Sequence, residues 1–280
     1  MKKTYFKLLL LAVICGIVNC LYLFATVKKA IPFSTIIDYY GLKDFYICSP
    51  YLIFFFRWYF PIILFQIIWG TYIYRHFCSA SVYHFSRCYN RVKWFLKEAA
   101  HLYIYVILYL MVLIATPVIL FSIYNKLTFD SASFMLLAYY MIIYSLWIFI
   151  FTLLVNILSI RFSSIIGFSI ISAIQMLCVS VYIVLHDLNI LTYEFKTASE
   201  IENLELQSKI IKFNPLSHIV FKYHKSGDQA LNKIINTYGF SFYLYESVLL
   251  LFVIAIIVVV AGCITIRKKD LITNNQEMEG

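Results

Sequence analysis

The residue types that could carry out chemistry are few in this chain and lie close together in sequence. Glu98 and His101 are three positions apart, so a helix would place a carboxylate and an imidazole on one face, and His76 and His84 are nearby. Such a group could bind a metal ion or transfer a proton. A helix start followed by an interfacial histidine has the same residues, and we prefer that simpler interpretation.

Familiar catalytic and nucleotide-binding signatures are absent from the sequence. None of the eight glycines belongs to a phosphate-binding loop, and there is no His-Glu-x-x-His pair and no Gly-x-Ser-x-Gly turn. The seven cysteines form no pair at metal-ligand spacing. We therefore expect no catalytic residue, no metal site and no cofactor bound by this chain. An intramembrane protease or transferase built around Glu98 and His101 is the enzyme alternative.

The elements that must position these residues are apolar. Hydrophobic residues make up 62% of the 280 residues and charged residues 13%, which is too little polar surface for a water-soluble globule. A hydrocarbon core roughly 30 Å thick needs about 20 apolar residues per helix. About six continuous runs meet this length: 5–25, 51–73, 102–123, 134–158, 165–185 and 247–266. The sequence predicts an all-α polytopic membrane protein with one transmembrane domain over residues 1–280.

The basic residues predict the orientation, because juxtamembrane Lys and Arg stay on the cytoplasmic side. With both ends inside, Lys2, Lys3 and Arg267 are cytoplasmic, and the short outer loops hold only Lys28, Lys29, Lys43 and Lys126. We therefore expect an N-in, C-in, multi-pass protein of the cell membrane. This bias also accounts for the net charge of +9, so the basic balance does not indicate nucleic acid.

Two connecting segments are long enough to have structure of their own. The inner one, 74–101, is basic and aromatic, and it is the one cytoplasmic piece large enough to contact a soluble partner. The outer one, 186–245, has a capping-box pattern at 197–200 and a chain break at Asn214-Pro215-Leu216. Helical spacing continues at 216–223 and 229–238, which predicts short helices on the outer face. A hydrated loop with accidental periodicity is the alternative.

Several polar side chains lie inside the expected spans. Arg57 lies about 9 Å of helix rise from the outer end, within reach of headgroups, and a latch to Asp44 or Glu246 is its best alternative role. Gln66 and Gln175 lie deeper, where an amide either joins helices or lines a substrate path. A stripe of mostly small residues on the fifth span suits a helix or subunit interface: Ser169, Ser172, Ala173, Met176 and Ser180.

From Ser86 to Lys97 the inner segment resembles the coupling helix between the second and third spans of ATP-binding-cassette type 2 permeases. The likeness extends to six spans, both ends inside, and a large outer loop that contains Asn-Pro-Leu at 214–216. In that family a cytoplasmic ATPase closes on nucleotide and pushes this helix. The resemblance implies that the coupling residues are Arg87, Arg91, Lys93, Trp94 and Lys97.

The resemblance also implies a function. The chain would be a permease subunit that pairs with a second copy or a sister permease, together with ATPase subunits that bind ATP and Mg. Export of a peptide, an antibiotic or a lipid-like compound follows by analogy with small bacterial permeases that give resistance to antimicrobial peptides. The alternative class is a non-transporting membrane scaffold, sensor or immunity protein that sequesters a ligand.

Overall fold

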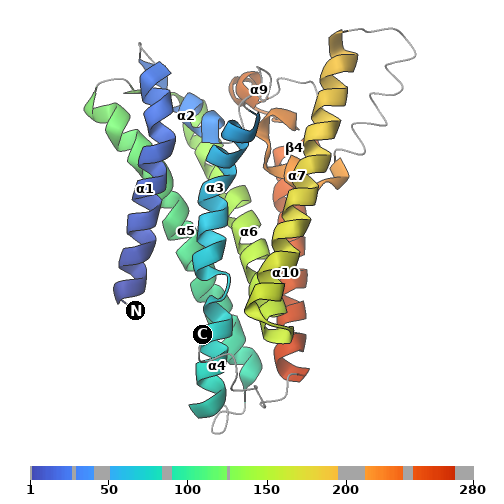
Figure 1. Ribbon diagram of the computed structural model, residues 1–280. Helices are drawn as coiled ribbons and strands as arrows, with labels where there is room; N and C mark the ends of the chain where they lie inside the picture. The colour runs from blue at the N-terminus through green and yellow to red at the C-terminus, as the bar shows by residue number, and fades with distance from the viewer. Residues whose placement is uncertain are drawn as a thin grey trace.

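The computed structural model describes residues 2–26, 30–40, 51–83, 90–124, 127–194, 212–235 and 242–268. Its long helices run side by side (Figure 1): α1 (Lys2–Thr26), α3 (Tyr51–Trp69), α5 (Arg91–Ile123), α6 (Ser131–Arg161), α7 (Ser164–Glu194) and α10 (Leu244–Lys268). Within this part of the chain, α5, α6, α7 and α10 are long and apolar enough to cross a membrane, and α1 has a shorter apolar stretch, Tyr5–Leu21. The prediction of an all-α membrane protein is confirmed.

Shorter elements lie at the two ends of the bundle. Helix α4 (Tyr72–Tyr83) lies at one end, which we call the α4 end; α2 (Phe33–Tyr40), α9 (Gln229–Ile235) and β4 lie at the other, the α2 end (Figure 1). Helix α1 begins and α10 ends on the α4 side. Two 3₁₀ turns and two parallel strand pairs complete the described elements: η1 (Pro215–Ile219), η2 (Phe221–Tyr223), β1 (Ile31–Pro32) with β2 (Leu127–Thr128), and β3 (His224–Lys225) with β4 (Phe242–Tyr243).

Helix α6 lies at the centre of the bundle. Every residue from 143 to 153 of α6 is buried, as expected of a helix that is apolar all round and enclosed by its neighbours. Helices α1, α7 and α10 bury one face only and leave large apolar side chains on the other, for example Leu21, Ile165 and Leu249. Such faces belong against lipid, because lipid chains are as apolar as the side chains themselves.

The second expected span, 51–73, is not one continuous helix. Helix α3 ends at Trp69, residues 70–71 form a turn, and α4 begins at Tyr72. A Cβ atom at Gly70 would overlap the Gln66 carbonyl oxygen and press on Val155, so only glycine fits this turn. The break was missed because residues 51–73 are apolar throughout. Hydropathy measures the affinity of a segment for lipid and does not show whether its helix is continuous.

The third expected span, 102–123, begins earlier than predicted. Helix α5 is continuous from Arg91 to Ile123, so the second half of the expected inner segment 74–101 forms its first turns and α4 forms the first half. Hydropathy places the start of a span after the last charged residues. The helix itself begins earlier, because the Lys, Leu, Glu and Ala residues between 93 and 100 favour helix strongly. Residues 84–89, including Arg87, lie outside the described part.

The outer segment 186–245 also differs in detail from its prediction. Helix α7 runs on to Glu194, past the expected end at 185, and the capping-box residues 197–200 lie outside the described part. Residues 215–223 form two 3₁₀ turns in place of an α-helix, since Pro215 starts a tight turn that Asn214 caps. Helix α9 lies within the expected helix 229–238.

Candidate functional site

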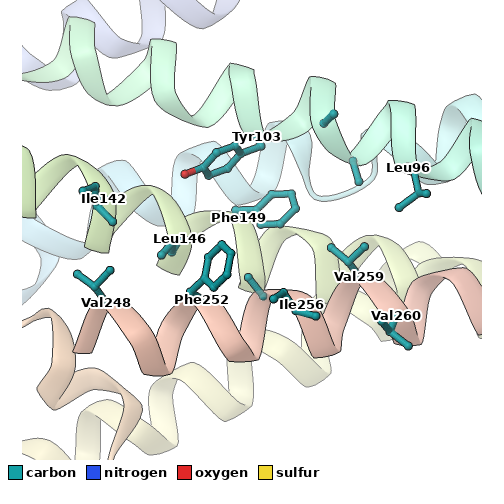
Figure 2. Close-up of a pocket in the computed structure, with 13 residues that line it drawn as sticks. Leu96, Tyr103, Ile142, Leu146, Phe149, Val248, Phe252, Ile256, Val259 and Val260 are labelled. Carbon is teal, nitrogen blue, oxygen red and sulfur yellow. The ribbon is translucent and has the colours of Figure 1, made fainter. Parts of the chain in front are cut away.

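An apolar groove runs along the bundle between α5, α6 and α10 (Figure 2), with a volume of about 530 Å³. Helix α10 forms one wall from Val248 to Val260, which corresponds to roughly 18 Å of helix rise. Phe252, Ile256 and Val260 are about half exposed, so the groove opens sideways out of the bundle. In a bilayer that opening faces the lipid chains, and a lipid-soluble group could enter without passing through water.

Tyr103 supplies the one polar side chain among the described residues that line the groove. Its hydroxyl lies 3.2 Å from Ser145 Oγ, and Ser145 in turn donates to the Ile142 carbonyl oxygen at 3.0 Å. The Tyr103 ring packs edge-on against Phe149, with ring centroids 5.2 Å apart. Apart from this hydroxyl, the lining offers dispersion contacts and no charge, so it suits an apolar chain better than a polar head.

The predicted coupling residues Arg91, Lys93, Trp94 and Lys97 lie on the first turns of α5. Asn90 caps the helix, because its side-chain oxygen accepts a hydrogen bond from the Lys93 backbone N–H at 3.0 Å. Lys93 and Lys97 are exposed and Arg91 is half-buried. The first turns of α5 therefore present a cationic face to solvent or headgroups, and Leu96, Ala99 and Ala100 of the same turns line the groove.

The opposite face of these turns is tightly packed. Phe95 is fully buried, and its ring lies so close to Gly262 of α10 that a Cβ atom at Gly262 would overlap it. The same added atom would also lie 3.1 Å from Ile157 Cδ1 of α6. The start of α5 is thus fixed against α10 and α6, which are the other two walls of the groove.

Helix α4 docks on the same turns of α5. The His76 ring nitrogen Nδ1 lies 3.0 Å from Glu98 Oε2, and the Phe77 and Trp94 rings lie 6.2 Å apart. The structure therefore brings His76 to Glu98, two of the residues singled out for proton or metal chemistry. No group of three metal-binding side chains occurs among the described residues.

The break between α3 and α4 is held by Asn156 of α6, which the sequence analysis did not single out. Its Oδ1 accepts hydrogen bonds from the backbone N–H groups of Ile73 at 2.7 Å and Tyr74 at 3.2 Å. Its Nδ2 donates to the carbonyl oxygens of Trp69 at 3.2 Å and Thr152 at 2.8 Å. One buried amide thus satisfies both helix ends at the break. An asparagine inside the apolar run 134–158 was the signal for it.

Arg75 also spans this break, because its Nη2 donates to the Ile68 carbonyl oxygen at 2.9 Å. Gln66, one turn before the break, and Gln175 on α7 are both buried, at 1% exposure each. The amide nitrogens of these two glutamines have no hydrogen-bond partner within the described part of the chain. Buried amide donors of this kind suit either of the roles predicted for them, helix contact or substrate path.

The small-residue stripe on α7 points away from the bundle. Ser169 is exposed and Ser172 is half-buried, whereas Gly167, Ile171 and Gln175 are buried on the other face. Gly167 makes the close approach to α6, since a Cβ atom there would lie 2.8 Å from Ser159 Oγ. The stripe is therefore outside the α6–α7 contact of this chain.

The outer motif Asn214-Pro215-Leu216 joins the 3₁₀ turns to the membrane helices. The Asn214 Oδ1 caps η1 by accepting from the Leu216 backbone N–H at 3.0 Å, and Nδ2 donates to the Cys178 carbonyl oxygen of α7 at 2.9 Å. Pro215 occupies the first position of η1, where its missing N–H costs nothing. Leu216 is buried. The motif thus holds η1 against α7 in this chain.

Glu246, the proposed partner of Arg57, lies in the first turn of α10. Its Oε2 lies 4.0 Å from Lys212 Nζ and accepts a hydrogen bond from the Tyr243 backbone N–H at 3.2 Å. The Arg57 side chain lies outside the described part of the chain, although its backbone belongs to α3. The described contacts of Glu246 therefore stay within the outer segment.

Comparisons with protein-family models, with curated proteins and with solved structures give no match for this chain.

Proposed function

We propose that this chain is the membrane-spanning permease subunit of an ATP-binding-cassette transporter, and that a separate cytoplasmic ATPase drives it. It exports a compound with an apolar chain, such as an amphipathic peptide, an antibiotic or a lipid-like molecule. The observation that carries the proposal is that the cationic docking face and one wall of the apolar groove belong to the same turns of α5.

The packing of α5 supports a mechanical role. A continuous helix of 33 residues is about 50 Å long, well beyond a hydrocarbon core of roughly 30 Å. Its cationic turns therefore extend past the membrane, where a soluble ATPase can reach them. Because Phe95 packs closely against Gly262 of α10, a push on these turns displaces α10 and changes the width of the groove.

The topology in this proposal has six spans with both ends in the cytoplasm. The α4 end then faces the cytoplasm, and the start of α1, the end of α10 and the docking face all lie on that side (Figure 1). The α2 end faces outward with α9, η1 and η2. The stripe with Ser169 and Ser172, which lies outside the α6–α7 contact, is where a second permease copy or a sister permease binds.

Charge reversal on the docking face tests the proposal. Arg91→Glu with Lys93→Glu keeps α5 folded, because acidic residues in a first helical turn are favourable. Loss of two charge contacts is expected to weaken ATPase binding by about tenfold. The measurement is stimulated ATP hydrolysis by the ATPase that co-purifies in mild detergent. Lys225→Glu with Lys233→Glu, two exposed cations of the outer segment, is the matched control.

Hydrolysis that is unchanged in the docking-face variant, or equally reduced in its control, would show that Arg91 and Lys93 do not couple the chain to the ATPase.

The groove is tested separately by Ala100→Phe, which fills it, and by Ala115→Phe at an exposed α5 position outside it. Only Ala100→Phe should lower transport, by about tenfold, the loss expected when steric exclusion removes roughly 1.4 kcal/mol of substrate binding. Equal transport by both variants would show that the substrate does not bind in the groove.

A further inference from the structure

At the α2 end of the bundle, two histidines approach one serine. His218 Nδ1 lies 2.8 Å and His224 Nε2 lies 2.6 Å from Oγ of Ser247, which belongs to the first turn of α10. The other ring nitrogens also have partners: His218 Nε2 lies 2.8 Å from the Lys212 carbonyl oxygen, and His224 Nδ1 lies 2.9 Å from the Val220 carbonyl oxygen. The three side chains are buried.

These contacts form a chain of four hydrogen bonds, and each needs one hydrogen atom. A neutral histidine supplies one N–H and a serine supplies one O–H, so the neutral groups supply only three. Backbone carbonyls can only accept, so each ring must turn its N–H toward Lys212 or Val220. The Ser247 hydroxyl can then donate to one ring, and the other ring nitrogen faces an oxygen lone pair.

We propose that the chain His218–Ser247–His224 is a binding site for one proton, carried as imidazolium by His218. The added Nδ1–H of His218 donates to Ser247 Oγ, and the Ser247 hydroxyl donates to His224 Nε2. Every contact then has its hydrogen. A second proton on His224 would leave the Ser247 hydroxyl without an acceptor and would place two cations side by side, so the site takes one proton.

Burial and the surrounding charges together identify His218 as the ring that binds the proton. Burial lowers the pKa of both rings, that of His224 to about 3. Glu246 of α10 opposes the lowering of the His218 pKa, and Lys212 adds to it. Because Lys212 and Glu246 approach to 4.0 Å, their effects partly cancel. Proton uptake by His218 is therefore expected below the usual histidine value of about 6.5.

The elements packed around η1 add mostly neutral groups. The Tyr144 hydroxyl of α6 donates to the Ile219 carbonyl oxygen at 3.1 Å, and the ring of Tyr182 on α7 lies 5.7 Å from that of Tyr223. Lys222 of η2 is a further buried cation in this region.

The proton would act on the connection between two membrane helices. Asn214 ties the start of η1 to α7, and His218 at the far end of η1 meets α10 through Ser247. Because the folded chain holds these rings neutral more strongly than the unfolded chain does, their contribution to stability is present at neutral pH. It falls as the pH drops below about 6.5. Mild acid therefore changes how the outer segment is fastened to α10.

Nitrogen NMR of the full-length, ¹⁵N-histidine-labelled protein in detergent tests the site. His218→Gln and His224→Gln assign the two rings. At neutral pH we expect His218 as the Nε2–H tautomer and His224 as the Nδ1–H tautomer. Between pH 8 and 4.5 His218 gains a proton with a midpoint below 6.5, and His224 stays neutral. Two rings that titrate together, or a His218 ring that never titrates, would contradict the proposal.

Ser247→Ala removes the acceptor for the added N–H, so it should move the His218 midpoint downward by about one pH unit. Glu246→Gln, which keeps the hydrogen-bonding shape, should also lower it because the attraction to imidazolium is lost. If Ser247→Ala does not fold, Glu246→Gln still shows whether the His218 midpoint falls. His76→Gln at the α4 end is the control and should leave the midpoint unchanged. A midpoint that neither Ser247→Ala nor Glu246→Gln lowers would overturn the assignment.

Discussion

At the residue scale, three buried amides in this bundle differ in what they do. Asn156 makes three hydrogen bonds to backbone groups at the α3–α4 break and a fourth to the Thr152 carbonyl oxygen of its own helix, whereas the amide nitrogens of Gln66 and Gln175 have no partner within the described part of the chain. The free backbone groups at a break must be satisfied inside a membrane, because lipid offers no hydrogen bonds. Asn156 therefore has a structural role that its position in an apolar run does not reveal.

Asn156→Leu should destabilise the protein by about 2–4 kcal/mol, because it leaves the N–H groups of Ile73 and Tyr74 without an acceptor. Thermal unfolding in detergent measures the loss. Thr152→Val, one turn away on α6, is the matched control, since Thr152 Oγ1 donates only to the Ile148 carbonyl oxygen within its own helix. If both variants unfold at the same temperature, Asn156 does not hold the break.

At the element scale, the sequence predicts the helical, apolar nature of the runs better than their limits. Residues 102–123 were expected to form the third span, and α5 adds eleven residues before them, from Arg91 to His101. These added turns carry the charges that end a hydropathy window. The break at 70–71 was missed because its cause, Asn156, is about eighty residues away in the chain. Long-range contacts of this kind leave no local signal.

The candidate site also has features that the sequence reveals and features that only the fold creates. Arg91, Lys93 and Lys97 could be singled out from sequence because charge next to an apolar run is a local property. The groove could not, since it depends on which faces of α5, α6 and α10 meet. The His218–Ser247–His224 chain was missed because its members come from three separate elements and carry no shared motif.

The contact between α5 and α10 should behave as a coupled pair. Gly262→Ala is expected to cost about 1–3 kcal/mol, because the new methyl group overlaps the Phe95 ring. Phe95→Leu alone is expected to cost about 1 kcal/mol by leaving a small cavity. The double variant should be more stable than the sum of the two losses predicts, since the smaller side chain makes room for the methyl group. Strict additivity in thermal unfolding would show that the two residues do not pack together.

At the scale of the whole molecule, the two ends of the helix bundle hold different elements. The α4 end holds the beginning of α1 and the end of α10, whereas the α2 end holds α2, α9 and β4 (Figure 1). Strand β4 pairs with β3, which carries His224 of the histidine chain, and α4 packs on the cationic start of α5. Helix α6 connects them through the buried centre. Helix α6 contacts α4 near one end and α2, α9 and η1 near the other, and the groove lies alongside it.

The export proposal requires the α4 end to lie in the cytoplasm, which thiol labelling of intact cells can test. In a variant whose seven native cysteines are replaced by serine, Gly227→Cys and Lys93→Cys place one thiol at each end. A side chain at Gly227 meets no other atom within 4 Å, and Lys93 is exposed, so both sites are open to a reagent. A membrane-impermeant maleimide should label Gly227→Cys directly and Lys93→Cys only after permeabilisation. The reverse pattern would place the cationic turns of α5 where no cytoplasmic ATPase can touch them, and the export proposal would fall with the orientation.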